Sequence, residues 1–169
     1  MKPNELQKLS SPVLASEYVQ QMLEAGAPPR EILTRLASAA EALAGPGTAT
    51  SILVLDQDGL LRHGASANMP PDYLAAIDGL KPDATVGTCA AAAATGSVVM
   101  TQDFLADNKW AELCHLPLAL GFVGAWSMPI KSPQGIFGTY FRERRHPTPE
   151  ERRGVELLAS AAALILANF

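Results

Sequence analysis

Residues 86–130, VGTCAAAAATGSVVMTQDFLADNKWAELCHLPLALGFVGAWSMPI, form the stretch around which the rest of the chain is interpreted. A short helix is predicted at residues 88–95, because the segment is almost wholly alanine and glycine follows it, as is common just past a helix end. Strands are predicted at residues 97–101 and 123–130, separated by a polar loop and a second short helix. Small side chains let the alanine helix approach a sheet or a ligand closely.

Two longer helices are predicted upstream of this stretch. Ser11 before Pro12 is a typical helix start, since a hydroxyl caps the helix and proline suits its first position. Pro29 opens the second helix, and the Gly-Pro-Gly sequence at residues 45–47 ends it. We therefore divide the chain into a helical extension, residues 1–47, and a domain that spans residues 48–169.

Two β-hairpins define the predicted sheet. The apolar run at residues 51–56 is typical of a buried strand, and an Asp-Gly pair predicts a tight turn into a return strand at residues 60–67. A turn at residues 131–135 joins the strand at 123–130 to one at 136–142. Tight turns join antiparallel neighbours, so we expect an α+β fold with a mostly antiparallel central sheet. The terminal helices would cover one face and the short helices the other.

The C-terminal helix carries more apolar surface than one sheet can bury. Thr148, followed three residues later by Glu151, predicts a capping box at its start. A helix packed on one sheet needs a single apolar stripe, but this one has a second stripe formed by Leu157, Ala161 and Leu164. The second stripe requires another partner, either an N-terminal helix or a second subunit, and we expect a homodimer through the terminal helices.

Composition argues against several classes of function. Of the 169 residues, 48% are hydrophobic and 18% are charged, which is typical of a globular protein. The net charge of −4 argues against a nucleic-acid partner, because phosphate binding needs a basic face. The polar N-terminus and the absence of a long apolar run predict a cytoplasmic protein with no membrane partner. The two cysteines and three histidines lack metal-ligand spacing, so we expect neither a metal nor a cofactor.

The chain resembles a GAF domain of the bacterial signal-transduction type. The similarity covers roughly residues 48–168, and its motifs are VGTCAAA, DFLAD, AWSMPI and GIFGTY, at residues 86–92, 103–107, 125–130 and 135–140. Ala90 departs from the pattern, since many relatives have glycine there. The resemblance implies a small-molecule pocket between the sheet and the short helices, and a non-catalytic sensor that signals through its terminal helices.

We therefore expect a small ligand to lie against the alanine helix. Main-chain amides near Thr88 would hold a polar or anionic group, and Trp110 and Trp126 would supply flat apolar walls. The candidate ligand-binding residues are Gly87, Thr88, Cys89, Ala90, Asp103, Trp110, Trp126, Ser127 and Tyr140. The expected partners are a small molecule, a second copy of the chain, and a kinase, cyclase or other output domain.

The cysteines raise alternative functions. At a helix start, the dipole should lower the pKa of the Cys89 thiol. One branch of the GAF family reduces free methionine sulfoxide with cysteines, one of them at the Cys89 position, although the sequence around Cys114 does not resemble that branch. Phytochrome-like GAF domains attach a bilin at a cysteine that is often followed by histidine. Cys114 and His115 form such a pair here, but their spacing to Gly121 differs from the phytochrome pattern. A further alternative is a ligand-free dimerisation module.

Overall fold

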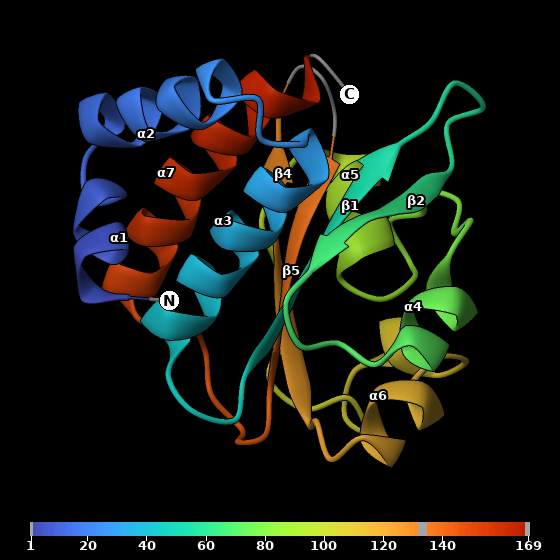
Figure 1. The fold of residues 1–169 in the computed structure, drawn as a ribbon. Helices are drawn as coiled ribbons and strands as arrows, with labels where there is room; N and C mark the ends of the chain where they lie inside the picture. The colour runs from blue at the N-terminus through green and yellow to red at the C-terminus, as the bar shows by residue number, and fades with distance from the viewer. Residues whose placement is uncertain (1, 132–134, 168–169) are drawn as a thin grey trace.

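An antiparallel sheet with strand order β2-β1-β5-β4-β3 forms the middle layer of the molecule (Figure 1). The computed structural model describes residues 2–131 and 135–167, and the central part of the turn predicted at residues 131–135 lies outside them. Over the described residues the strands are β1 (Ala49–Leu55), β2 (Leu61–Ser66), β3 (Val99–Thr101), β4 (Gly124–Ile130) and β5 (Gly135–Phe141). The α+β fold class and both predicted hairpins are confirmed, with strand ends that differ by one or two residues.

The central strand β5 pairs with a strand on each side. Gly138 lies opposite Ser51 of β1 and opposite Ser127 of β4. The β1–β2 turn is held by Asp56, whose carboxylate accepts hydrogen bonds from the main-chain N–H groups of Asp58 and Leu60, both at 2.9 Å. The sheet therefore brings together strands from both halves of the chain.

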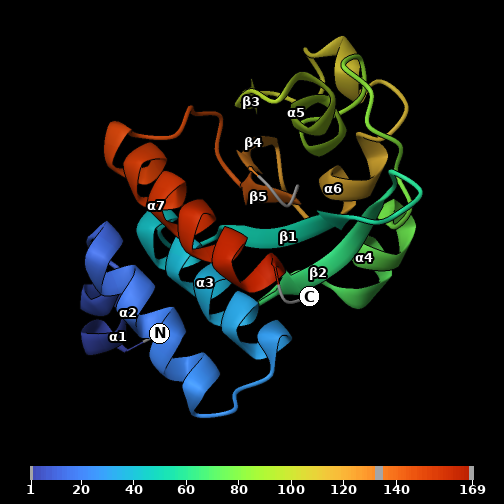
Figure 2. The ribbon, with the colours of Figure 1, turned by 90° about the horizontal axis from the view of Figure 1, so that it is seen from above.

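Long helices form the layer on one face of the sheet (Figure 2). These are α2 (Pro12–Glu24), α3 (Pro29–Ala44) and α7 (Pro149–Leu166), with the short α1 (Pro3–Lys8) beside them. The α3 and α7 helices pack on the sheet, and α2 packs on α7. Ala161 of the second apolar stripe is buried, whereas Leu164 is 45% exposed. An N-terminal helix of the same chain thus covers part of that stripe. The α1 helix was not predicted.

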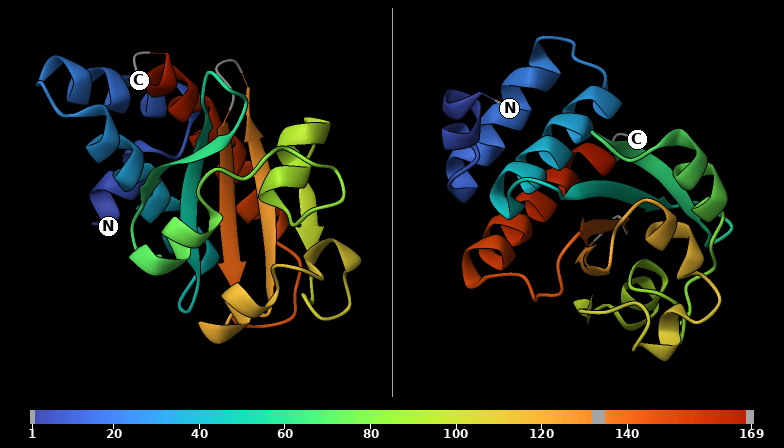
Figure 3. Two further views of the ribbon diagram at one scale, coloured as in Figure 1. Left: turned by 90° about the vertical axis from the view of Figure 1, so that its right-hand side faces the viewer. Right: turned by 90° about the horizontal axis from the view of Figure 1, so that it is seen from below.

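Short helices cover the opposite face (Figure 3). They are α4 (Pro71–Ile77), α5 (Cys89–Thr95), the 3₁₀ helix η1 (Asn108–Trp110) and α6 (His115–Ala119). Adjacent residues of a strand point to opposite faces, so Tyr140 joins the core beneath the short helices and Phe141 joins the core beneath the long ones. One strand therefore contributes to both cores.

Side chains hold the start of α7 and contact one edge strand of the sheet. The capping box is present, because Thr148 accepts a hydrogen bond from the Glu151 N–H and the Glu151 carboxylate accepts one from the Thr148 N–H. At the outer edge strand β2, Arg30 donates to the carbonyls of His63 and Gly64, and the His63 N–H donates to Asp78 at 3.0 Å.

Within the part of the chain that the structure describes, no helix is both long and apolar enough to cross a lipid bilayer.

Candidate functional site

A small apolar pocket lies beneath the short helices, on the face of the sheet opposite α3 and α7. Its lining comes from α4, the loop at residues 80–87, the start of α5, residues 110–116 and the central strand β5. The residues are Tyr73, Ile77, Leu80, Val86, Gly87, Thr88, Cys89, Ala90, Trp110, Leu113, Leu116 and Tyr140. The free space is about 10 Å³, which is room for about one water molecule. Among these twelve described residues, none has a charged side chain.

Three aromatic rings form the walls. The ring of Tyr73 meets that of Tyr140 edge-on, with centroids 5.5 Å apart and planes at 82°. Trp110 meets Tyr140 at 6.5 Å and 79°. The indole also lies against Gly87, where an added Cβ would be 3.7 Å from the ring, and its N–H donates to the Thr101 hydroxyl at 3.1 Å. The walls are therefore fixed by packing and hydrogen bonding.

A chain of neutral hydrogen-bonding groups forms the floor. The Tyr73 hydroxyl donates to the Tyr140 hydroxyl at 2.7 Å, and Tyr140 also interacts with the Cys89 side chain. The Cys89 thiol lies 3.2 Å from the Ser127 hydroxyl, which donates to Thr88 at 2.9 Å. The polar atoms of the floor are thus largely satisfied by one another.

Burial keeps the floor protonated. It raises the pKa of the Cys89 thiol to about 11, and it raises the pKa of Tyr140 well above its ordinary value. The prediction of a lowered Cys89 pKa is wrong, because the loss of hydration in this buried position outweighs the stabilisation that a helix start gives a thiolate. At neutral pH the site therefore presents phenols and a thiol without formal charge.

The thiol packs over a glycine in the central strand. A Cβ at Gly138 would lie 2.8 Å from the Cys89 sulfur, with the Ser51 and Ser127 hydroxyls 3.6 and 3.8 Å away. Ser51 is fully buried, and its hydroxyl has no hydrogen-bond partner within the described part of the chain. Gly138 thus creates the space into which the α5 cysteine fits.

Six of the nine residues predicted from the sequence line this pocket. They are Gly87, Thr88, Cys89, Ala90, Trp110 and Tyr140. Ser127 lies behind them, bonded to Thr88 and Cys89. Asp103 does not line the pocket: it accepts a hydrogen bond from the Leu105 N–H and forms an ion pair with Arg144 at 3.3 Å.

The prediction that Trp126 walls the pocket is wrong. Trp126 is buried in the core beneath the long helices, together with Met128 and Phe137. Neighbouring residues of a strand face opposite sides of the sheet, so Trp126 and Ser127 cannot both face the pocket. Because the sequence predicted one strand through both residues, the alternation of side chains along a strand was enough to exclude one of the two from the pocket.

The ligand site expected at the main-chain amides near Thr88 stays a prediction. The N–H of Gly87 donates to the Lys109 carbonyl at 2.7 Å, and the Thr88 side chain makes no capping hydrogen bond to α5. Six residues that line the pocket were not predicted as ligand-binding: Tyr73, Ile77, Leu80, Val86, Leu113 and Leu116. Val86 directly precedes the predicted residues, whereas the other five lie on elements distant from residues 86–90 in sequence or in short irregular turns. Only the apolar spacing of Tyr73 and Ile77 marked a helix face.

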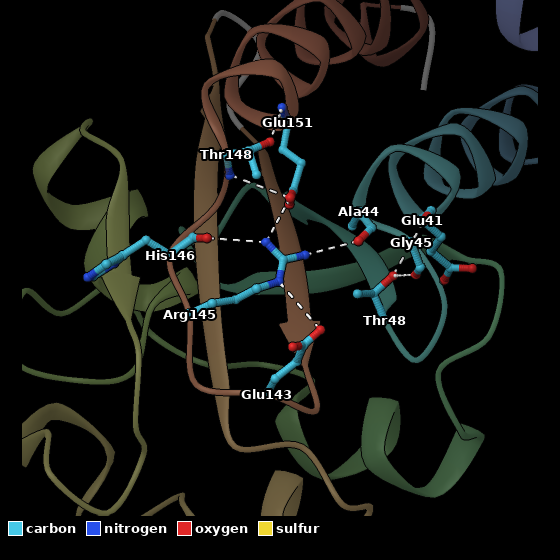
Figure 4. Close-up of polar contacts among 9 residues, drawn as sticks. All are labelled: Glu41, Ala44, Gly45, Thr48, Glu143, Arg145, His146, Thr148 and Glu151. Carbon is cyan, nitrogen blue, oxygen red and sulfur yellow. Dashed lines mark hydrogen bonds and ion pairs between the residues drawn. The ribbon is translucent and has the colours of Figure 1, made fainter.

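A second polar cluster, centred on Arg145, lies where the ends of α3, α7 and β5 meet (Figure 4). The Arg145 guanidinium donates to the Glu151 carboxylate at 2.7 Å and to the Ala44 carbonyl at 2.9 Å. Its central carbon lies 4.0 Å from the centroid of the Phe141 ring. Arg145 therefore connects the end of α3, the start of α7 and the last residue of β5.

Within residues 2–131 and 135–167, no group of three or more His, Cys, Asp or Glu residues is placed to hold a metal ion.

Comparison with known proteins gives a consistent fold assignment. A family model described as a GAF domain matches residues 26–167. The chain is 28% identical over 159 residues to a methyl sulfide methyltransferase-associated sensor of Methanosarcina acetivorans. This match covers 91% of the chain and 16% of that protein, so the chain spans about one sixth of its relative's length.

Solved structures show the same architecture. The GAF domain from a phosphoenolpyruvate-protein phosphotransferase of Coxiella burnetii superposes with a TM-score of 0.71 at 18% identity, over 95% of both chains. A type II free methionine-R-sulfoxide reductase of Thermoplasma acidophilum superposes with a TM-score of 0.65 at 17% identity, over 84% of this chain and 97% of that one. At these identities the likeness establishes the fold alone.

Proposed function

Because this chain belongs to the GAF domain family, we propose that it is a non-catalytic sensory domain whose small ligand binds in the pocket beneath the short helices. GAF domains typically bind small molecules and sit beside output domains such as kinases. The Methanosarcina relative is itself a sensor and much longer than this chain. Ligand occupancy would pass through the terminal helices to a kinase, cyclase or other output domain.

One observation carries this proposal: strand β5 contacts both the pocket and the Arg145 cluster. Tyr140 lines the pocket, and the next residue, Phe141, packs under the Arg145 guanidinium. Arg145 in turn holds Ala44 at the end of α3 and Glu151 at the start of α7. A shift of Tyr140 upon ligand binding would therefore be felt where two long helices meet.

The reductase remains the enzymatic alternative, and the geometry gives it little support. A catalytic thiol needs access and a substantial thiolate fraction. Cys89 is 6% exposed, and burial raises its pKa to about 11. Cys114 is half-buried at the start of α6 and does not line the pocket, and both cysteines are free thiols. Turnover of free methionine sulfoxide that disappears in Cys89→Ser would favour the enzyme.

Two further parts of the proposal concern organisation. We propose that residues 1–47 are a helical extension to a domain over residues 48–169, with α3 of the extension packed on the sheet.

We also propose that the chain forms a homodimer through the outer surface of the long helices, where Val13 and Leu164 are exposed. Sedimentation of Leu164→Glu beside the parent chain tests the dimer, and two identical monomers would refute it.

Hydrogen–deuterium exchange tests the sensory function. Protein purified from its own host is first examined by native mass spectrometry for a retained small molecule, with Ala90→Leu as the pocket-filling comparison. We expect the parent to carry a ligand that Ala90→Leu lacks, and removal of that ligand to change exchange across residues 149–166. The sensory proposal fails if the native mass spectra of the parent and Ala90→Leu show no difference in bound ligand, and α7 exchanges at the same rate before and after the ligand-removal step.

A further inference from the structure

The inner surface of the pocket is uncharged at every described residue that lines it. Its polar side-chain atoms are two phenols, a thiol, a threonine hydroxyl and an indole N–H, and these bond to one another or to neighbouring hydroxyls. Burial raises the pKa of the phenols and of the thiol, so they stay protonated throughout the physiological range. A charged ligand would lose its hydration here without gaining a counter-charge.

The opening of the pocket is apolar as well. Leu80 and Val86 on one loop, and Leu113 and Leu116 before and within α6, line the pocket and are half-buried, unlike the fully buried residues of its floor. These four side chains separate the pocket from solvent. A molecule that enters must pass between aliphatic groups, which favours an apolar body over an ionic one.

We propose that the pocket selects small, neutral, predominantly apolar molecules and discriminates against both anions and cations of the same size. This inference rests on the proposed ligand-binding function and refines it. The free space of about 10 Å³ requires the half-buried side chains at the opening to move when a ligand of several heavy atoms enters. A hydroxyl or carbonyl on the ligand can be placed against the Tyr73–Tyr140 pair, where it exchanges one neutral hydrogen bond for another.

Three probes with one apolar body test the selectivity: isobutanol, isobutyrate and isobutylamine, which is a cation at neutral pH. Saturation-transfer NMR and the melting temperature give the relative affinities for the full chain. We expect isobutanol to bind at least about tenfold more tightly than either ion, the ratio that corresponds to about 1.4 kcal/mol. Val86→Phe, which narrows the opening, should abolish this binding. Val54→Phe, a half-buried position on the other core, should leave it intact.

A second pair of variants tests whether a positive charge at the opening makes the pocket accept an anion. Leu113→Lys places an ammonium group at the opening and should increase the affinity for isobutyrate several-fold. Leu74→Lys, at a half-buried position of α4 outside the pocket lining, should not. Circular dichroism checks that each variant folds, and Val86→Phe tests the site independently of the lysine variants.

The outcomes separate the two proposals. If isobutyrate or isobutylamine binds as tightly as isobutanol, and Val86→Phe abolishes that binding, the neutral selectivity is refuted while the ligand-binding function stands. If none of the three probes binds, or if Val86→Phe and Val54→Phe bind alike, the pocket is not a ligand site and the proposed function fails with the inference.

Discussion

The hydroxyl of Tyr73 on α4 donates a hydrogen bond of 2.7 Å to the hydroxyl of Tyr140 on β5, and both side chains are at most 5% exposed. The bond ties a short helix of the pocket layer to the central strand of the sheet. Buried hydroxyls without a partner are costly, so the pair fixes the position of α4 over the pocket.

A double-mutant cycle measures this pair. Tyr140→Phe leaves the Tyr73 hydroxyl buried without its acceptor and should lower the free energy of unfolding by about 1–3 kcal/mol. Tyr73→Phe should cost about 1 kcal/mol, because Tyr140 keeps its contact with Cys89. Urea denaturation should give a double variant less destabilised than the sum of the two, by about 1 kcal/mol. Strict additivity would contradict a coupled pair.

The two cysteines should react at very different rates. With a pKa of about 11, Cys89 carries roughly one thiolate in a thousand molecules at pH 8, and it is buried. A chromogenic disulfide reagent should therefore modify one thiol rapidly in the native protein and two after denaturation. In Cys114→Ser the rapid phase should disappear. A rapid phase that persists in this variant would show that Cys89 is accessible.

Gly138 and Cys89 should show compensation. Gly138→Ala places a methyl group 2.8 Å from the Cys89 sulfur, which overpacks the contact between α5 and β5 and should cost about 1–3 kcal/mol of unfolding free energy. In a Cys89→Ala background the same change meets an emptied space and should cost under about 1 kcal/mol. Equal costs in both backgrounds, measured by chemical denaturation, would rule out this contact as the reason for glycine.

Arg145 and Arg144 are adjacent arginines with different expected roles. Arg145→Lys cannot serve Glu151 and the Ala44 carbonyl together, and it leaves a carboxylate that is 6% exposed poorly paired, so we expect a loss of about 2–3 kcal/mol. Arg144 is 67% exposed in its ion pair with Asp103, and Arg144→Lys should change stability by less than about 0.5 kcal/mol. Equal effects in urea denaturation would argue against the cluster as a link between α3 and α7.

His63 should make the fold sensitive to mild acid. Burial, and to a lesser extent the charge of Arg30, lowers the pKa of His63 from its ordinary value of 6.5, although Asp78 opposes the shift. The folded state then binds a proton less readily than the unfolded state, so this stability is present above pH 6.5 and is lost as pH falls through the lowered pKa. Between pH 7.5 and 5, the parent should lose more stability than His63→Gln. Parallel pH profiles would refute the assignment.

Much of the fold follows from local sequence rules. The capping box at Thr148, the helix start at Ser11 and the Asp58-Gly59 turn depend on neighbouring residues, and the structure confirms each of them. The three-residue strand β3 and the helix α1 carry weaker local signals, since their stability comes from the elements against which they pack. The pairing of β1 with β5 was not predicted, because it joins segments that lie far apart in the sequence.

The site was harder to predict than the fold. Gly87 and its neighbours were found because a small-residue helix start is visible in the sequence. Tyr73 was missed because its pairing with Tyr140 depends on the placement of α4 over the sheet. The pKa of Cys89 was predicted in the wrong direction because the sequence shows a helix start but not the depth of burial above Gly138.

The strand order has a consequence for how the chain reaches its folded state. The β1–β2 hairpin precedes β5 in the sequence, and the other edge of β1 is filled only by β5. Contacts between distant segments close slowly, and an open strand edge invites pairing with other molecules. A nascent chain that ends before residue 135 therefore exposes the unpaired main-chain groups of the β1 edge, which favours aggregation until β5 has been made.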